Sequence, residues 1–186
     1  MITKELKNKK LIIVITSVVV VLLLLVILFF SLFNINIIVN GKENETIEYG
    51  DTYTEEGASA SYNTLSFKNK SVDVSISGEV DCSKLGTYHI HYKAKKGFLS
   101  STKTREVKVV DTAAPVIELN TVEGYYPKTG EAYKEEGFTA TDNYDGDMTK
   151  KVEVIKNEKF YLYKVSDSNG NKTSIKRNIT YEDKVK

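Results

Sequence analysis

The feature that most restricts how this chain can fold is an uninterrupted apolar segment at residues 11–33. The segment contains no charged side chain, and Thr16, Ser17 and Ser31 are its only polar ones. As a helix it would reach roughly 35 Å, which is enough to cross a hydrocarbon core of about 30 Å. The sequence therefore predicts one membrane-spanning α-helix, with membrane contact through residues 11–33.

The charges before this segment predict its orientation. Residues 1–10 carry four lysines against a single glutamate, and such a positive excess keeps that side cytoplasmic. The alternative is a cleaved signal peptide, whose apolar core runs about 7 to 15 residues and ends in a small-x-small site. The longer run here favours an uncleaved anchor. We expect a single-pass protein of the cell membrane, with a cytoplasmic tail (1–10), an anchor (11–33) and an extracellular remainder.

The composition of the remainder excludes several classes of function. Of the 26 Lys and Arg and 25 Asp and Glu in the chain, 22 and 24 follow the apolar segment, so the remainder lacks the basic excess of a nucleic-acid-binding protein. Cys82 is the only cysteine, so no intramolecular disulfide is available. We found no Gly-x-Ser-x-Gly, His-Glu-x-x-His or phosphate-binding glycine loop, and these absences predict that the protein is not an enzyme.

An internal repeat defines the organisation of the remainder. Six residues recur at an offset of 80 positions: Gly50, Tyr53, Glu55, Glu56, Gly57 and Ala60 match Gly130, Tyr133, Glu135, Glu136, Gly137 and Ala140. We therefore expect two homologous domains, a first copy at residues 35–111 and a second copy at residues 112–183. Because the glutamate pairs recur in both copies beside a glycine, we expect them to be structural rather than catalytic.

Each copy has the pattern of β-strands. Tyr88, Ile90 and Tyr92 alternate with polar residues, and so do Val107 and Val109, the period of two that marks a half-buried strand. Several short strands and frequent turns within about 75 residues are typical of a small β-sandwich. The predicted fold class is all-β, with two sandwich domains after a single transmembrane helix.

The second copy resembles a known family. Its residues include a Pro115-Val-Ile-Glu-Leu segment, then Gly130, Tyr133, Glu135, Gly137 and Ala140, an Asp142-Asn-Tyr-Asp-Gly-Asp147 loop, and an Asp167-x-x-Gly170-Asn171 turn. This combination is similar to a bacterial immunoglobulin-like (Ig-like) domain family of unknown function, named after a pesticidal crystal protein and found in tandem on Gram-positive surface proteins. The first copy is a divergent relative. The resemblance implies a β-sandwich stalk or binding module without its own chemistry.

Two groups of residues are candidate metal sites. Asp142, Asn143, Asp145 and Asp147 place three carboxylates and an amide within six residues, and such oxygen-rich loops can hold Ca²⁺. The alternative is an Asx-type turn in which these side chains satisfy backbone amides. The first copy has Tyr62 where the second has Asp142, so the fold tolerates loss of the carboxylates. No other cofactor is indicated.

A second possible metal site is the histidine pair. His89 and His91 share one strand face, but solvated alternation explains them without a metal. Cys82 is interpreted as an unpaired thiol in a turn, since no base motif accompanies it.

These observations lead to one functional hypothesis and three alternatives. The leading hypothesis is a membrane-anchored, non-catalytic extracellular module that binds cell-wall polymer, a host surface or another surface protein. The first alternative is a structural spacer or subunit of an envelope complex without its own ligand. The second is an accessory module to a cell-wall enzyme, and the third is a sensor, for which the short cytoplasmic tail offers little output.

Overall fold

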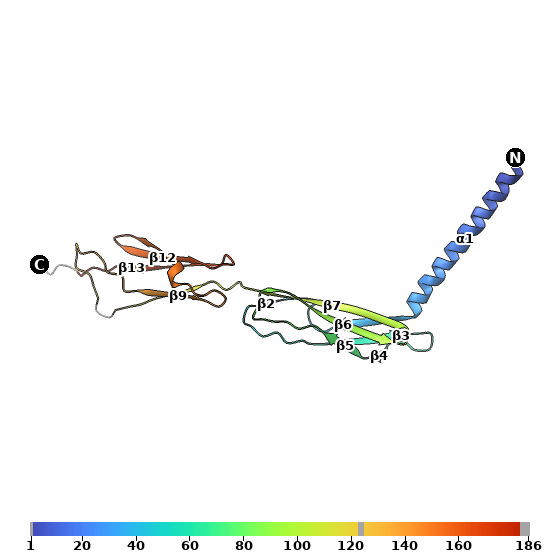
Figure 1. The fold of residues 1–186 in the computed structure, drawn as a ribbon, viewed down its shortest axis with the longest axis horizontal. Helices are drawn as coiled ribbons and strands as arrows, with labels where there is room; N and C mark the ends of the chain where they lie inside the picture. Colours follow the sequence, from blue (N-terminus) through green and yellow to red (C-terminus); the bar gives the residue numbers. More distant parts are fainter. Residues whose placement is uncertain (1, 123–124, 183–186) are drawn as a thin grey trace. The chain divides into compact units, whose positions relative to one another are not determined.

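The computed structural model describes residues 2–122 and 125–182, and it begins with one long helix (Figure 1). Helix α1 spans Ile2–Leu32, so it includes most of the predicted tail as well as the predicted anchor. Its segment Leu11–Leu32 has a mean hydropathy of 3.6, and none of it is buried in the protein. By length and composition this helix is able to cross a membrane, as the sequence predicted.

After the helix, the regular structure of the described chain consists of β-strands and one 3₁₀-helix, which confirms the predicted all-β class. The first copy contains β1 (Asn34–Val39), β2 (Asn44–Glu48), β3 (Ala58–Asn63), β4 (Lys70–Val72), β5 (Val74–Ser77), β6 (Gly86–Lys96) and β7 (Leu99–Val110). The second contains β8 (Val116–Leu119), β9 (Phe138–Asp142), β10 (Gly146–Asp147), the 3₁₀-helix η1 (Thr149–Lys151), β11 (Glu153–Lys156), β12 (Phe160–Ser166) and β13 (Lys172–Asn178).

The strands form two sheets in each copy. The sheet orders are β1-β3-β4 and β2-β7-β6-β5 in the first copy, and β10-β9-β8 and β11-β12-β13 in the second. Strands β1 and β3 pair antiparallel, as do the equivalent strands β8 and β9: Ile37 lies opposite Ala60 in the first copy and Ile117 opposite Ala140 in the second. The repeat found in the sequence is thus matched by equivalent strand pairing.

The alternating strands bury the residues that their period predicts. In β6, Ile90, Tyr92 and Ala94 are buried while the residues between them are exposed, and in β7 the buried residues include Val107 and Val109. In the second copy Ile117 and Ala140 of one sheet pack with Tyr163 and Val165 of the other, around the fully buried Met148. Apolar burial between two sheets is the main stabilising contribution to such a sandwich.

Each copy also buries an arginine against a glutamate and a tyrosine. In the first copy Arg105 Nη1 lies 3.2 Å from Glu55 Oε2, the same carboxylate accepts a hydrogen bond from Tyr92 Oη at 2.7 Å, and Arg105 Nη2 donates to the Asn40 carbonyl. The Glu55 carboxylate also accepts the backbone N–H of Gly57, at 2.7 Å. We call these residues the first arginine cluster.

The second arginine cluster repeats the contacts among arginine, glutamate, tyrosine and glycine with equivalent residues, and its arginine also lies 2.9 Å from Glu136 Oε1 and donates to Tyr133 Oη at 2.9 Å. Arg177 pairs with Glu135 at 3.5 Å, Tyr163 Oη donates to Glu135, and Glu135 accepts the backbone N–H of Gly137 at 3.0 Å. Gly137 has a φ of +101°, a region that favours glycine, and Gly57 has +80°. The glutamates next to these turns are therefore structural, as their recurrence predicted.

The chain divides into two compact units whose limits differ from those of the sequence copies. One unit comprises Met1–Glu45, Thr54–Glu79 and Tyr88–Val107, and the other comprises Thr46–Tyr53, Val80–Thr87 and Lys108–Lys186. The domain limits 35–111 and 112–183 remain predictions from the repeat. All the residues of the candidate site described next belong to the second of these units.

Candidate functional site

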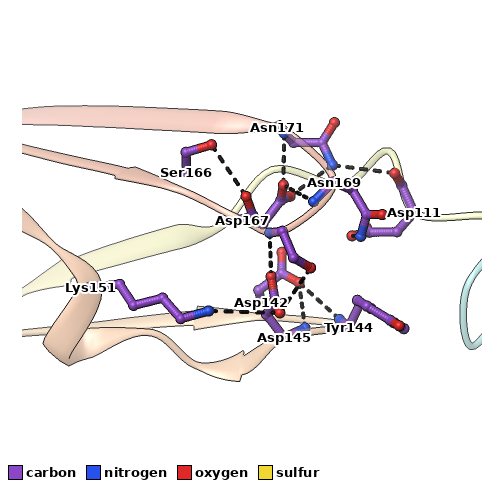
Figure 2. Close-up of polar contacts among 10 residues, drawn as sticks. Asp111, Asp142, Tyr144, Asp145, Lys151, Ser166, Asp167, Asn169 and Asn171 are labelled. Carbon is purple, nitrogen blue, oxygen red and sulfur yellow. Dashed lines mark hydrogen bonds and ion pairs between the residues drawn. The ribbon is translucent and has the colours of Figure 1, made fainter.

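Three aspartates from separate strand ends meet in the second unit (Figure 2). Asp111 directly follows β7, Asp142 is the last residue of β9, and Asp167 directly follows β12. Each contributes a carboxylate oxygen, and these oxygens all lie within 4.8 Å of one another. Asp111 and Asp167 are each only 7% exposed, and Asp142 is half-buried. We call this group the aspartate cluster.

Hydrogen bonds fix one oxygen of Asp111 and of Asp142 and both oxygens of Asp167, whose Oδ2 accepts a hydrogen bond from Asn171 Nδ2 at 2.7 Å. Asp167 Oδ1 accepts the backbone N–H groups of Asn169 and Asn171, at 2.9 and 2.8 Å. Asp142 Oδ1 accepts those of Tyr144 and Asp145, at 2.9 and 2.8 Å. Local turn chemistry thus holds Asp142 and Asp167 in place.

Asp111 is held by the side chains of the turn that follows β12. Its Oδ2 accepts a hydrogen bond from Asn169 Nδ2 at 2.6 Å, and its carbonyl accepts one from Asn171 Nδ2 at 3.3 Å. The Asp167-x-x-Gly-Asn turn of the sequence motif therefore positions two of the three carboxylates.

Two oxygens of the aspartate cluster are buried and have no hydrogen-bond donor among the residues that the structure describes. These are Asp111 Oδ1 and Asp142 Oδ2. Burial raises the pKa of the Asp111 carboxyl, and the negative charges of Asp142, Asp167 and Glu48 raise it further, against the hydrogen bond from Asn169. A buried acceptor without a partner is costly, so the cluster has the charge and the acceptors that suit a cation.

The segment that follows Asp111 is tied down by Glu48. The Glu48 carboxylate accepts the backbone N–H groups of Thr112 and Ala113, at 2.9 and 3.1 Å, and the Thr112 hydroxyl at 2.7 Å. Burial opposes ionisation of Glu48, but these hydrogen bonds and a longer one from Asn143 leave its pKa below the ordinary value. The ionised Glu48 thus helps to position Asp111.

The residues predicted as a calcium loop do not converge on one point. Asn143 Nδ2 donates to the Tyr49 carbonyl at 3.3 Å and to Glu48 Oε1 at 3.4 Å. Asp147 Oδ1 accepts the backbone N–H of Thr149 at 2.9 Å. The pKa of Asp147 is lowered, first by a hydrogen bond from the Thr149 side chain and then by this one from its backbone.

Asp145, the remaining member of the predicted loop, also faces protein donors. It accepts hydrogen bonds from the Ser168 backbone N–H and hydroxyl, at 2.6 and 3.0 Å, and lies 3.8 Å from Lys151 Nζ. The Ser168 backbone N–H is the main cause of the lowered pKa of Asp145. Of the four predicted residues, only Asp142 belongs to the aspartate cluster, and calcium binding by this loop remains a prediction.

The other predicted candidates lie elsewhere. The rings of His89 and His91 are 6.4 Å apart on an exposed strand face, where His91 Nδ1 contacts Thr104 Oγ1 at 3.2 Å. Among residues 2–122 and 125–182, one group of three or more His, Cys, Asp or Glu side chains lies close enough together to hold a metal ion, and it is the aspartate cluster. Cys82 is a partly exposed free thiol.

A separate open groove of about 740 Å³ lies at the other strand ends of the second copy. Three tyrosines (Tyr133, Tyr161 and Tyr181), two lysines (Lys156 and Lys159) and two glutamates (Glu131 and Glu158) contribute to its walls. Tyr133 and Tyr161 meet edge to face with ring centroids 5.0 Å apart, and Lys156 Nζ lies 5.6 Å from the Tyr161 centroid. Aromatic faces beside polar side chains of both charges suit a ligand that offers sugar rings with polar substituents.

Sequence reasoning missed Asp111 and Asp167 as members of a site, although both residues were visible. In the sequence, Asp111 is the last residue of the first copy, and Asp167 is part of the motif that resembles the Ig-like family. Their meeting with Asp142 depends on the pairing of strands far apart in sequence.

Comparisons with known proteins place part of the chain in a structural class. Residues 37–109 match the family described as "Bacterial surface protein, Ig-like domain". No curated protein matches the sequence. The match lies in the first copy and supports a bacterial surface Ig-like domain there, while the tandem Gram-positive family suggested by the second copy remains a resemblance.

Two solved structures are similar at low identity. One is a lipoprotein from Bacteroides thetaiotaomicron, with 14% identity and a TM-score of 0.37, covering 78% of this chain and 80% of that one. The other contains the M60 catalytic domain with two CBM51 domains of ZmpB from Clostridium perfringens, with 15% identity and a TM-score of 0.45. That match covers 82% of this chain and 31% of the other. The apolar helix and the Ig-like match together fit a membrane-anchored or secreted surface protein.

Proposed function

We propose that this protein is a membrane-anchored, non-catalytic module that projects from a bacterial surface and binds a cell-wall polymer. The anchor and the Ig-like match support the location and the absence of catalysis. The observation that carries the binding step is the groove lined by Tyr133, Tyr161 and Tyr181 with Lys156 and Lys159. Tyrosine rings stack on sugar rings, and lysines pair with phosphate or carboxylate groups.

Co-sedimentation with purified bacterial cell walls tests the binding step, using the full chain in detergent micelles. The variant is Lys159→Ala with Tyr181→Ala, which removes one charge and one ring from the groove. Lys159 is exposed and Tyr181 is partly exposed, so little core packing is lost. The matched control is Lys134→Ala with Tyr126→Ala, which removes an exposed lysine and a tyrosine that is 59% exposed.

We expect the groove variant to lose at least tenfold in affinity and the control to bind like the wild type. Walls stripped of their anionic polymers separate the two contributions, because binding that persists depends on the tyrosines and binding that is lost depends on the lysines. Equal binding by the two double variants would contradict a role for the groove and leave a spacer as the better description.

The single cysteine allows a direct test of topology. A membrane-impermeant thiol reagent applied to intact cells should label Cys82, because the proposed orientation places it outside. A matched variant, Cys82→Ser with Thr3→Cys, should be labelled only after the cells are opened. The intact mass of the purified protein then separates an uncleaved anchor, near 20.9 kDa, from a cleaved signal peptide. Labelling of the Thr3→Cys variant in intact cells would reverse the orientation.

A further inference from the structure

We propose that Asp111, Asp142 and Asp167 form a Ca²⁺ site that joins the segment after β7 to the ends of β9 and β12. The proposal goes beyond the function proposed above and does not depend on the groove or on any wall polymer. It also differs from the loop predicted by sequence, because only Asp142 is common to both.

Two independent observations support the site. The first is the convergence of three carboxylates, with oxygens within 4.8 Å of one another (Figure 2). The second is that Asp111, which is 93% buried, keeps Oδ1 without a hydrogen-bond donor, as does Asp142 at Oδ2. Every donor that the structure places on these three side chains acts on another of their oxygens. The two unpartnered oxygens are thus free to coordinate a cation.

The arrangement of the donors explains why removing the cation would leave a cost. Asn169 and Asn171 hold Asp111 and Asp167 together, and Glu48 holds the Thr112 and Ala113 amides. These contacts force like charges into proximity, which is unfavourable in a buried place unless a positive charge compensates. The protein has therefore organised the acceptors before any cation binds.

The chemistry of the ligand atoms selects among metal ions. All three side chains offer carboxylate oxygen, and calcium takes six to eight oxygen ligands in flexible geometry, so water would complete the shell. Zinc favours histidine and cysteine ligands, which this cluster lacks. Magnesium demands near-ideal octahedral geometry at short distances. Extracellular calcium modules bind with Kd of about 10⁻⁴ to 10⁻³ M, and we expect this range.

The decisive variant is Asp111→Asn, because its effect should change sign with calcium. The amide oxygen of an asparagine can still accept the hydrogen bond from Asn169, while the amide nitrogen replaces the unpartnered oxygen and removes one negative charge. Without calcium the variant should be more stable than the wild type, because repulsion in the aspartate cluster falls. With calcium it should be less stable than the wild type, because it lacks a ligand.

The experiment uses the full chain in detergent micelles, with calorimetric titration of Ca²⁺ and thermal unfolding in chelator, Ca²⁺ or Mg²⁺. At ten times Kd, calcium should raise the folding equilibrium constant of the wild type about tenfold. Mg²⁺ should have a much smaller effect. The matched control is Asp145→Asn, which removes a nearby carboxylate that faces Ser168 and Lys151. This control should keep the full calcium response.

Two outcomes would overturn the proposal. If Asp111→Asn stabilises the protein equally in chelator and in calcium, and the wild type gives no binding heat at millimolar Ca²⁺, a shared proton rather than a metal satisfies the cluster. If Asp145→Asn abolishes calcium binding while Asp111→Asn retains it, the ion binds to the loop and not to the aspartate cluster.

Discussion

The two copies place different chemistry at equivalent strand ends. Tyr62 corresponds to Asp142 at the repeat offset of 80, and Lys96 corresponds to Asp167 at the offset of 71 that aligns Tyr92 with Tyr163. In the first copy Lys96 Nζ lies 5.6 Å from the centroid of the Tyr62 ring. In the second, two carboxylates take these places and a third, from Asp111, joins them. The first copy thus places a lysine ammonium group at this strand end, whereas the second places carboxylates that can accept a cation.

The arginine clusters, by contrast, share an arginine, a glutamate, a tyrosine and a glycine turn in the two copies. Arg105 and Arg177 each lie 5.9 Å from the centroid of a buried tyrosine ring, those of Tyr92 and Tyr163. Each pairs with the glutamate that also holds a glycine turn. The comparison teaches that the arginine cluster is part of what makes this sandwich fold, while the strand ends are free to diverge.

The largest expected effect comes from removing the buried arginines. Arg105→Met should destabilise the first copy by about 3 to 5 kcal/mol, because it leaves the partly buried Glu55 without its partner. Arg177→Met should cost about 3 kcal/mol in the second copy, since Arg177 is more exposed, at 9% against 1%. Denaturant unfolding of the full chain in micelles measures the total loss, and hydrogen exchange locates it.

The control for the arginine prediction is an exposed ion pair. Lys103 lies 3.0 Å from Glu43, and both side chains are well exposed, so Lys103→Met should cost less than about 1 kcal/mol. If Arg105→Met increased exchange equally in both copies, the view of two copies with separate arginine clusters would fail.

An intermediate effect is expected in alkali, and it concerns the second arginine cluster. Burial and a hydrogen bond to Glu136 raise the pKa of Tyr133 to about 12, although Arg177 opposes this, and burial raises the pKa of Tyr163 as well. A tyrosine whose pKa is higher in the folded state stabilises the fold below its unfolded pKa, near 10, and loses that contribution as the pH rises toward 12.

Stability should therefore fall by about 2 kcal/mol between pH 10 and pH 12 because of Tyr133 alone, at 1.36 kcal/mol per pKa unit. Denaturant unfolding across this range measures the loss, and ultraviolet absorbance of phenolate follows the ionisation. The Tyr133→Phe variant should show a shallower decline. An unchanged slope in that variant would mean that Tyr133 ionises at an ordinary pH.

The sequence was sufficient to predict what depends on periodicity and composition. The alternation of Tyr88, Ile90 and Tyr92 predicted β6, and the apolar run predicted the helix that contains Leu11–Leu32. The recurrence of Glu55 at Glu135 indicated a structural role before any contact was known. These signals are local or repeat at one offset, so they can be recognised in the sequence alone.

The aspartate cluster could not be predicted in the same way. Its members are separated by 31 and 25 residues in the sequence, and only the strand pairing brings Asp111 and Asp167 to Asp142. The density of oxygen ligands in residues 142–147 suggested a local site instead. In the structure, Asp145 and Asp147 accept hydrogen bonds from the backbone amides of Ser168 and Thr149. Local ligand density therefore indicated a region that contains Asp142, whereas the neighbours of Asp142 in the aspartate cluster come from distant strands.

The smallest expected effect tests whether the first copy is indifferent to metal. Lys96→Met keeps the apolar stem and removes the charge beside Tyr62, so it should cost only about 0.5 to 1 kcal/mol, the size of an exposed cation–π contact. The loss of stability should be the same in chelator and in calcium, because removing the lysine charge does not create a pair of carboxylates that could bind calcium. Thermal unfolding in both conditions measures it, beside Asp111→Asn in the same buffers. A calcium-dependent loss in Lys96→Met would place metal binding in both copies and remove the contrast between them.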